Sequence, residues 1–352
     1  MANAHEISIV TYQSQVKAYL TGIDLNCLPG WDGSADFSLQ PLAQGEYNMN
    51  FLLSQGWKRF VVRVNTGSQI GKSLPEQIRY EFQTLKMLEP AGVTPKVNYL
   101  DDGCVVLPYG VMIMEYLPGE KLDYLEDNCA AATLFAKYHQ LEISAPAHLI
   151  IEETPLSLTY QRCLIMAPKY WESDLADPSV SSFLKEIFAW ADQARLREAF
   201  FIQDPWHCVI NTEVNNGNFI KNLKKHTLHL VDWEKPLWGD PSQDLSHYRV
   251  PTTTLWKTEY RMSLADQMDM MQVYKGQLMD KHLVDTIEER TRLRDPFNCL
   301  RGVSWCAMAW VLYQTGKQIL RNPDTWRKLA MYVDIGFLHE LFDPYMKGGN
   351  NA

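Results

Sequence analysis

The sequence predicts an α+β protein with two lobes: a small, strand-rich N-terminal lobe and a larger, mainly helical C-terminal lobe. Two observations support this prediction. Short apolar segments separated by glycine-containing turns fill residues 37–117, a pattern typical of β-strands around one helix. From about residue 127 the apolar residues recur at helical spacing, and strand-like segments return only at 208–232. We therefore place the lobes at 1–118 and 119–346.

The N-terminal lobe is predicted to begin with a helix and to continue as a sheet. Apolar residues at helical spacing indicate the helix over residues 6–22, and three short strands follow within 37–65. Residues 75–92 have a proline near the start and a glycine after the end, which are typical boundaries of a helix. Two further strands are expected on either side of the turn at 101–103.

The C-terminal lobe is predicted to be helical, with an inserted loop and hairpin. The helical patterns cover residues 128–142, 180–200, 255–283, 296–317 and 323–342. We expect the inserted segment, 208–234, to contain a catalytic loop, and the helical region 250–342 to bind the substrate. The tail 347–352 is polar and glycine-rich, and we expect it to be disordered.

Composition restricts the classes of partner. The chain has 352 residues and a formal charge of −9, which argues against nucleic acid and against anionic membrane surfaces. The longest apolar stretch, 302–313, is too short to span a bilayer. The seven cysteines are scattered and include no C-x-x-C pair, and the N-terminus does not resemble a signal peptide. A reduced, cytoplasmic protein with no membrane partner is therefore expected.

Residues 208–234 carry two of the features that phosphoryl transfer from a nucleotide requires: metal-binding groups and a carboxylate that orients the attacking hydroxyl. Glu213 and Asn218 are five residues apart, which is the spacing of the catalytic aspartate and the metal-binding asparagine in kinase loops. Asp232 follows fourteen residues later at the end of an apolar strand, where a second metal ligand is expected. The pattern predicts a carboxylate that orients the attacking hydroxyl and two groups that bind magnesium.

The same region resembles the aminoglycoside phosphotransferase and choline kinase superfamily, which has a protein-kinase-like fold. The shared motifs, in order and at matching spacing, are D-W-E at 232–234 and G-D-P-x-x-D-L at 239–245. The resemblance implies that Glu213 is the catalytic residue and that Asn218 and Asp232 bind Mg²⁺. It also implies accessory roles for Asn211 and Glu234.

The N-terminal lobe agrees with this resemblance from about residue 37 onward. "LAQGEYNMNFLL" is similar to the family's phosphate loop, "FVVRVN" places an arginine where the family has a cation for the phosphates, and "VMIMEYLPGEKL" resembles its adenine-binding hinge. The helix glutamate that pairs with that cation also has a counterpart. The implied ATP-binding residues are Gly45, Asn48, Arg63, Glu81, Glu115 and Leu117.

Two departures from the family pattern lie in the catalytic loop: Asn211 replaces the usual histidine and Glu213 replaces the usual aspartate. Glutamate is one methylene longer, and a misplacement of that order can cost ~10²-fold in rate in a site built for aspartate. A site shaped around glutamate avoids this loss, because a loose transition state depends on positioning more than on basicity. We favour an active kinase; the alternative is a weak or inactive relative that binds nucleotide or metabolite in a regulatory role.

Other interpretations are weaker. The segment "TGSQIGKS" has threonine where a P-loop needs its first glycine. A protein kinase would be expected to show D-F-G and A-P-E, and neither motif follows Asp232. Four aromatic residues of the C-terminal region fit either a cation-binding box or packing between helices, and we favour packing: Trp256, Trp305, Trp310 and Tyr313.

The sequence thus predicts an ATP- and Mg²⁺-dependent kinase that phosphorylates a hydroxyl group of a small metabolite. The acidic net charge and the resemblance favour a cationic or amine-bearing acceptor.

Overall fold

The computed structural model describes residues 9–45, 47–144, 146–316 and 323–348. Contacts within the chain divide it into two compact units, which we call unit 1 and unit 2. Unit 1 comprises Met1–Leu122, Leu141–Ile150 and Gly217–Leu237. Unit 2 comprises Asp123–Gln140, Ile151–Asn216 and Trp238–Ala352. The first break lies close to the boundary expected at residue 118, but 217–237 groups with unit 1 although the sequence placed it in the C-terminal lobe.

Unit 1 is built on a five-stranded sheet in the order β1-β2-β3-β5-β4, in which all neighbours are antiparallel. The strands are β1 (Ser38–Gln44), β2 (Asn48–Gln55), β3 (Lys58–Asn65), β4 (Val97–Asp101) and β5 (Gly110–Glu115). A two-residue loop joins β2 to β3, and its first residue, Gly56, has φ 58°, a conformation that glycine adopts without strain. The predicted strands are therefore confirmed.

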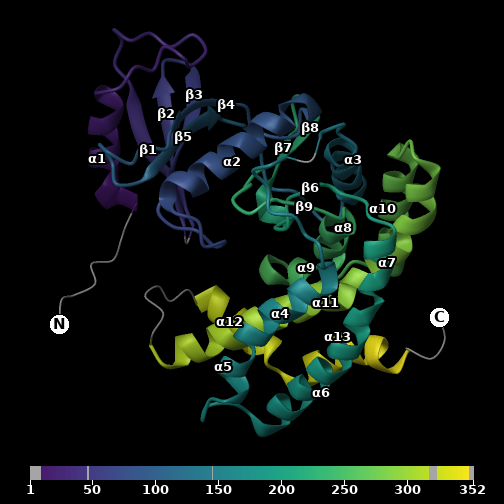
Figure 1. The fold of residues 1–352 in the computed structure, drawn as a ribbon. Helices are drawn as coiled ribbons and strands as arrows, with labels where there is room; N and C mark the ends of the chain where they lie inside the picture. The colour runs from purple at the N-terminus through teal and green to yellow at the C-terminus, as the bar shows by residue number, and fades with distance from the viewer. Residues whose placement is uncertain (1–8, 46, 145, 317–322, 349–352) are drawn as a thin grey trace. The chain divides into compact units, whose positions relative to one another are not determined.

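The alternation of side chains along β3 gives the sheet two different faces. Phe60, Val62 and Val64 are buried in a core shared with α1 (Ile9–Thr21), which lies beside β1 in Figure 1. Arg63, out of phase with them, meets Glu81 of α2 (Leu74–Leu88) instead. One sheet face thus holds the apolar core, and the other carries a buried cation.

The segment 217–237 belongs to unit 1 because of its hydrogen bonds. Its hairpin consists of β7 (Phe219–Asn222) and β8 (Thr227–Leu230), which follow a 3₁₀ turn at Asn216–Asn218. The hairpin pairs with Glu120 through Lys221, and the amide of Leu230 donates to the carbonyl of Val93 at 2.8 Å. These contacts tie both ends of the hairpin to residues near the sheet.

Unit 2 is mainly helical and carries one small sheet, formed by β6 (Cys208–Ile210) and β9 (Leu237–Gly239). Its first helices are α3 (Asn128–His139), α4 (Pro155–Met166), α5 (Pro168–Trp171), α6 (Pro178–Ala194) and α7 (Ala199–Gln203). Helices α8 (Ser242–Arg249), α9 (Pro251–Lys257), α10 (Leu264–Gln277), α11 (Lys281–Gln314), α12 (Pro323–Tyr332) and α13 (Ile335–Lys347) follow.

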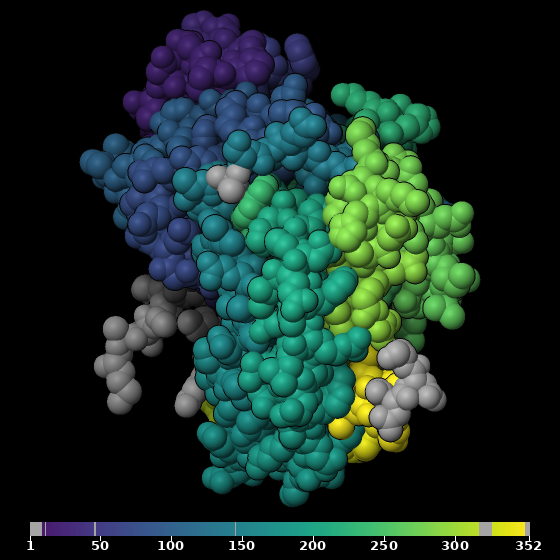
Figure 2. All heavy atoms as spheres, turned by 45° about the vertical axis from the view of Figure 1, so that its right-hand side comes forward, coloured from purple at the N-terminus to yellow at the C-terminus, as the bar shows by residue number. Residues whose placement is uncertain are grey.

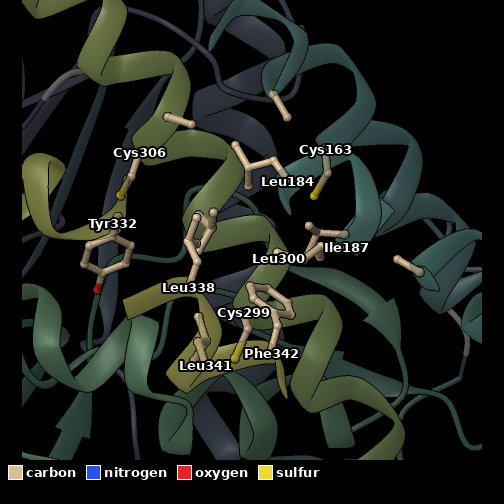
Figure 3. Packing of buried hydrophobic residues seen from close by; sticks show 14 of the residues in the cluster. Cys163, Leu184, Ile187, Cys299, Leu300, Cys306, Tyr332, Leu338, Leu341 and Phe342 are labelled. Atoms are coloured by element: carbon tan, nitrogen blue, oxygen red, sulfur yellow. The ribbon is translucent and has the colours of Figure 1, made fainter. Parts of the chain in front are cut away.

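The core of unit 2 forms around α11. Figure 3 shows Leu300 of this helix among side chains from α4, α6 and α13, with Leu184, Leu338 and Phe342 close to it. In the space-filling view, α6 (teal) and α13 (yellow) come to the surface of the unit near one another (Figure 2). The aromatic residues considered for a cation box pack against this core, and Trp310 and Tyr313 both stack on Trp326.

Three helix predictions were inaccurate. Helix α11 begins at Lys281 rather than near Pro296, which lies inside it. Its first half is held by buried arginines, because Arg290 binds Asp240 and Arg294 binds Glu152. The pattern at 255–283 is divided between α9 and α10, and the pattern at 323–342 is broken where Asp334 caps α13.

No helix within the described residues is long and apolar enough to cross a membrane. The disorder expected for 347–352 is wrong at its first residue, because Lys347 is the last residue of α13 and its Nζ donates to Asp343 at 2.7 Å. Residues 349–352 of this tail lie outside the described residues.

Candidate active site

In unit 1 two of the predicted site residues, Glu81 and Asp232, meet at Arg63, whose side chain is only 6% exposed. Its Nε donates to Glu81 at 3.0 Å, and its Nη2 donates to Oδ1 of Asp232 at 2.8 Å. The carboxylate of Glu234 lies 3.7 Å from the same Nη2. The predicted pair of Arg63 and Glu81 is thus present, and Asp232 shares the cation.

The cluster holds more negative than positive charge, since one guanidinium faces three carboxyl groups. Burial raises the pKa of Glu81 to about 7, although Arg63 opposes this shift. Burial, together with the charge of Asp232, also raises the pKa of Glu234 to about 7. Burial disfavours the charge on Arg63, but the carboxylates outweigh it and raise the pKa of the guanidinium. Such a cluster favours the uptake of a further cation.

A backbone hydrogen bond brings the segments of the two predicted metal ligands, Asn218 and Asp232, close together. The carbonyl of Asn218 accepts a hydrogen bond of 2.8 Å from the amide of Val231, next to Asp232. Asp232 itself has φ 63°, in the left-handed region, where aspartate is tolerated. Across the described residues no group of three or more His, Cys, Asp and Glu is arranged to hold a metal ion. Two protein ligands nevertheless suit Mg²⁺, which usually keeps water and substrate phosphate as its other ligands.

Glu234 connects the predicted phosphate loop to this cluster through hydrogen bonds. Its Oε2 accepts a 2.6 Å hydrogen bond from the side chain of Asn48, and its Oε1 accepts one from Gln69. Its backbone carbonyl accepts from Gln77 of α2 at 2.6 Å. Gly45 closes the loop, because its amide donates to the carbonyl of Asn48 at 2.9 Å. The sequence left the role of Glu234 open. In the structure Glu234 binds Asn48 before β3 and Gln69 and Gln77 after β3, and so it anchors the segments on either side of this strand.

The predicted hinge residues lie at the end of β5. The amide of Glu115 donates to the carbonyl of Lys96 at 2.8 Å, and Leu117 follows, half-buried, in the segment after the strand. Neither residue belongs to the Arg63 cluster, so an adenine-binding role for them stays a prediction.

In unit 2 the predicted catalytic loop is held by Asp244, the last acid of the G-D-P-x-x-D motif. This carboxylate is fully buried and accepts hydrogen bonds from the amides of Asn211 at 2.7 Å and Thr212 at 2.8 Å. The hydroxyl of Tyr138 donates to it at 2.5 Å. Burial works against its charge, but hydrogen bonds, first among them that of His139, hold the pKa of Asp244 below its usual value. The sequence did not assign this role to Asp244.

Asn211, which stands where the family has a histidine, makes a hydrogen bond within the loop. Its side-chain oxygen accepts a 2.9 Å hydrogen bond from the amide of Glu213, and the residue is completely buried. Thr212 between them has φ 72°, which is unusual for a β-branched residue and costs about 1–3 kcal/mol. The loop therefore holds a strained backbone conformation at the residue before Glu213.

The side chain of Glu213 meets a residue that the sequence analysis missed. Arg301 of α11 donates from Nη2 to Oε1 of Glu213 and from Nη1 to the carbonyl of Thr212 at 3.1 Å. Both side chains are about one quarter exposed. The available signal was that Arg301 is the only charged residue of the segment 296–313.

Comparisons with known proteins place this arrangement in a family. The model of the phosphotransferase enzyme family matches residues 38–272, more than half of the chain. Thiamine kinases of Escherichia coli and Shigella dysenteriae are 26% identical over 286 residues, which are 80% of this chain and 86% of each relative.

Solved structures agree on the fold. A choline kinase from Cryptosporidium parvum superposes with a TM-score of 0.64 at 14% identity, covering 94% of this chain and 97% of that one. A spectinomycin phosphotransferase in complex with ADP and spectinomycin gives a TM-score of 0.58 at 12% identity, covering 89% and 94%. At these identities the likeness concerns the fold alone.

Proposed function

The chain belongs to the phosphotransferase enzyme family, as a small-molecule kinase, and from this premise we propose that it transfers a phosphoryl group from ATP to a hydroxyl of a small metabolite. The observation that supports this most is the buried ion cluster of Arg63, Glu81 and Asp232. A buried cation shared by a helix glutamate and a metal-binding aspartate is what a nucleotide kinase needs to hold phosphates.

Each residue then has a defined part. Arg63, held by Glu81, binds the phosphates of ATP, and Asn48 with Gly45 covers them. Asn218 and Asp232 would hold Mg²⁺, and the ion would supply charge neutralisation at the phosphates. Glu213 orients the attacking hydroxyl and accepts its proton. The backbone from Glu115 to Leu117 meets the adenine.

The class of acceptor is the finer part of the proposal. Relatives and structural neighbours are named for thiamine, choline, ethanolamine and spectinomycin. Together with the charge of −9, these names support an acceptor that carries an amine or another cation. Arg301, which lies beside Glu213, instead favours an acceptor with a negative charge. The set of acceptors to be tested, the acceptor panel, should therefore contain a neutral and an acidic alcohol of the same size for each amino alcohol.

Two measurements test the proposal together. ADP release and the mass of the product are followed across the acceptor panel, and thermal stabilisation by ATP with Mg²⁺ is measured separately. We expect one acceptor class to gain a phosphoryl group while ADP is released in equal amount. Stabilisation by ATP without product from any acceptor would instead favour the second function, a nucleotide-binding protein that acts in regulation.

A further inference from the structure

The contact between Arg301 and the catalytic loop involves two points. One guanidinium nitrogen binds the carboxylate of Glu213, and the other binds the carbonyl of Thr212. The planar guanidinium carries its donors in a fixed geometry, so contact at two points also fixes orientation. A surface ion pair between two flexible side chains would lack the second contact and would contribute little.

Thr212 is held from both sides. Asp244 accepts from its amide at 2.8 Å, and Arg301 donates to its carbonyl at 3.1 Å. Its φ of 72° persists only if the surroundings determine it, because the conformation is unfavourable for threonine. Arg301 therefore contacts the two groups that set the position of the carboxylate: the strained peptide before Glu213 and the carboxylate itself.

A glutamate base needs this restraint more than an aspartate would. The extra methylene adds a rotatable bond, and a freely rotating carboxylate would spend less time in the productive position. A carboxylate has acceptor sites on both oxygens, so an arginine at Oε1 and a substrate hydroxyl can share it. The arginine reduces basicity, but orientation matters more than basicity in a loose phosphoryl-transfer transition state.

We propose that Arg301 is a positioning residue that holds the carboxylate of Glu213 for catalysis, and that the pair is matched to glutamate and not to aspartate. The inference rests on the proposed function of Glu213. Replacing aspartate by glutamate is then an adaptation of this active site, since the longer side chain reaches a cation on α11.

The experiment uses the full chain with the best acceptor from the panel, or with water as acceptor through ATP hydrolysis. The variants are Arg301→Gln, Arg301→Lys, Glu213→Gln, Glu213→Asp and the double variant Arg301→Gln with Glu213→Gln. Arg292→Gln is the matched control, because Arg292 lies on the same helix, is exposed and pairs with Glu289. Circular dichroism and thermal unfolding confirm that each variant folds.

We expect Arg301→Gln and Glu213→Asp each to lower kcat about 10- to 100-fold, the range expected for a misplaced catalytic group. The KM for ATP should stay within about twofold, because a positioning residue affects the transition state and not nucleotide binding. Arg301→Lys should recover part of the loss. In the Glu213→Gln background, Arg301→Gln should lower kcat by less than about a further threefold, because the effects of residues that act as a unit are not additive.

Several results would overturn the proposal: an unchanged kcat in Arg301→Gln, equal losses in both backgrounds, or Glu213→Asp at least as active as the parent. Hydrogen exchange of the amides at 211–214 gives a readout without turnover, and it should accelerate in Arg301→Gln but not in Arg292→Gln. If the parent protein transfers no phosphate at all, the proposed function fails. Unchanged exchange would then refute the restraint by Arg301 separately.

Discussion

Replacing Asp244 with asparagine should release the catalytic loop. The carboxylate is fully buried and serves two backbone amides, those of Asn211 and Thr212, through its two oxygens. Asparagine has one carbonyl oxygen and an amino group, so at least one buried N–H loses its acceptor. The conformation of Thr212, which the loop needs to direct Glu213, loses a main support.

The expected magnitude follows from these contacts. A buried donor without a partner costs about 1–3 kcal/mol. The remaining hydrogen bonds change from charged to neutral, and each loses about 1 kcal/mol. With two such bonds remaining, from Tyr138 and from one of the two amides, Asp244→Asn should lower the free energy of unfolding by about 3–5 kcal/mol. Tyr138→Phe removes one donor and keeps the carboxylate, so about 1.5 kcal/mol is expected for this comparison variant.

Urea unfolding followed by far-ultraviolet circular dichroism measures both variants, and phosphoryl transfer is assayed on the folded proteins. Asp244→Asn should also lower kcat by ~10²-fold, since the loop that carries Glu213 is displaced. A loss of stability below about 1 kcal/mol, or no greater than that of Tyr138→Phe, would refute the reasoning that a buried charge fixes the loop.

Three further predictions concern unit 1. Arg63→Met should abolish thermal stabilisation by ATP with Mg²⁺, whereas Arg63→Lys should retain part of it; equal stabilisation of both variants would contradict the role of the guanidinium. The pKa of Glu81 is about 7 in the folded protein and 4.5 ordinarily, so the folded state binds more protons between these two pH values. The nucleotide-free protein should therefore lose stability as the pH rises through this window, and calorimetry can measure the loss. Glu81→Gln should make stability less dependent on pH in this window. An unchanged slope of stability against pH would refute the assignment of this dependence to Glu81. Glu234→Ala should raise the KM for ATP about tenfold with little change in kcat, because Asn48 loses its anchor; a fall in kcat alone would argue for a different role.

The elements of unit 1 and the site motifs could be predicted from local patterns. The five strands alternate or carry apolar runs between turns, and α2 has a proline at its start. Glu213, Asn218 and Asp232 could be proposed as site residues because their spacing along the chain reflects one loop and one hairpin. These features depend on residues close together in sequence.

Features that depend on distant partners could not be predicted. Arg301 lies 88 residues from Glu213, and no local pattern relates the two. The start of α11 was missed because Pro296 is typical of a first turn, while the contacts that hold the preceding turns involve Glu152 and Asp240. The hairpin at 217–237 was assigned by sequence order, yet its hydrogen bonds to Glu120 and Val93 place it in unit 1.

The most direct test of the account is single-turnover transfer from γ-labelled ATP to the best acceptor, with Mg²⁺, by the parent protein and by Glu213→Gln. We expect transfer by the parent and a loss of at least ~10²-fold in the variant, the lower end for removing a positioned base, with ATP binding unchanged. Equal rates for the two proteins would contradict the central claim that this chain is a kinase whose catalytic residue is Glu213.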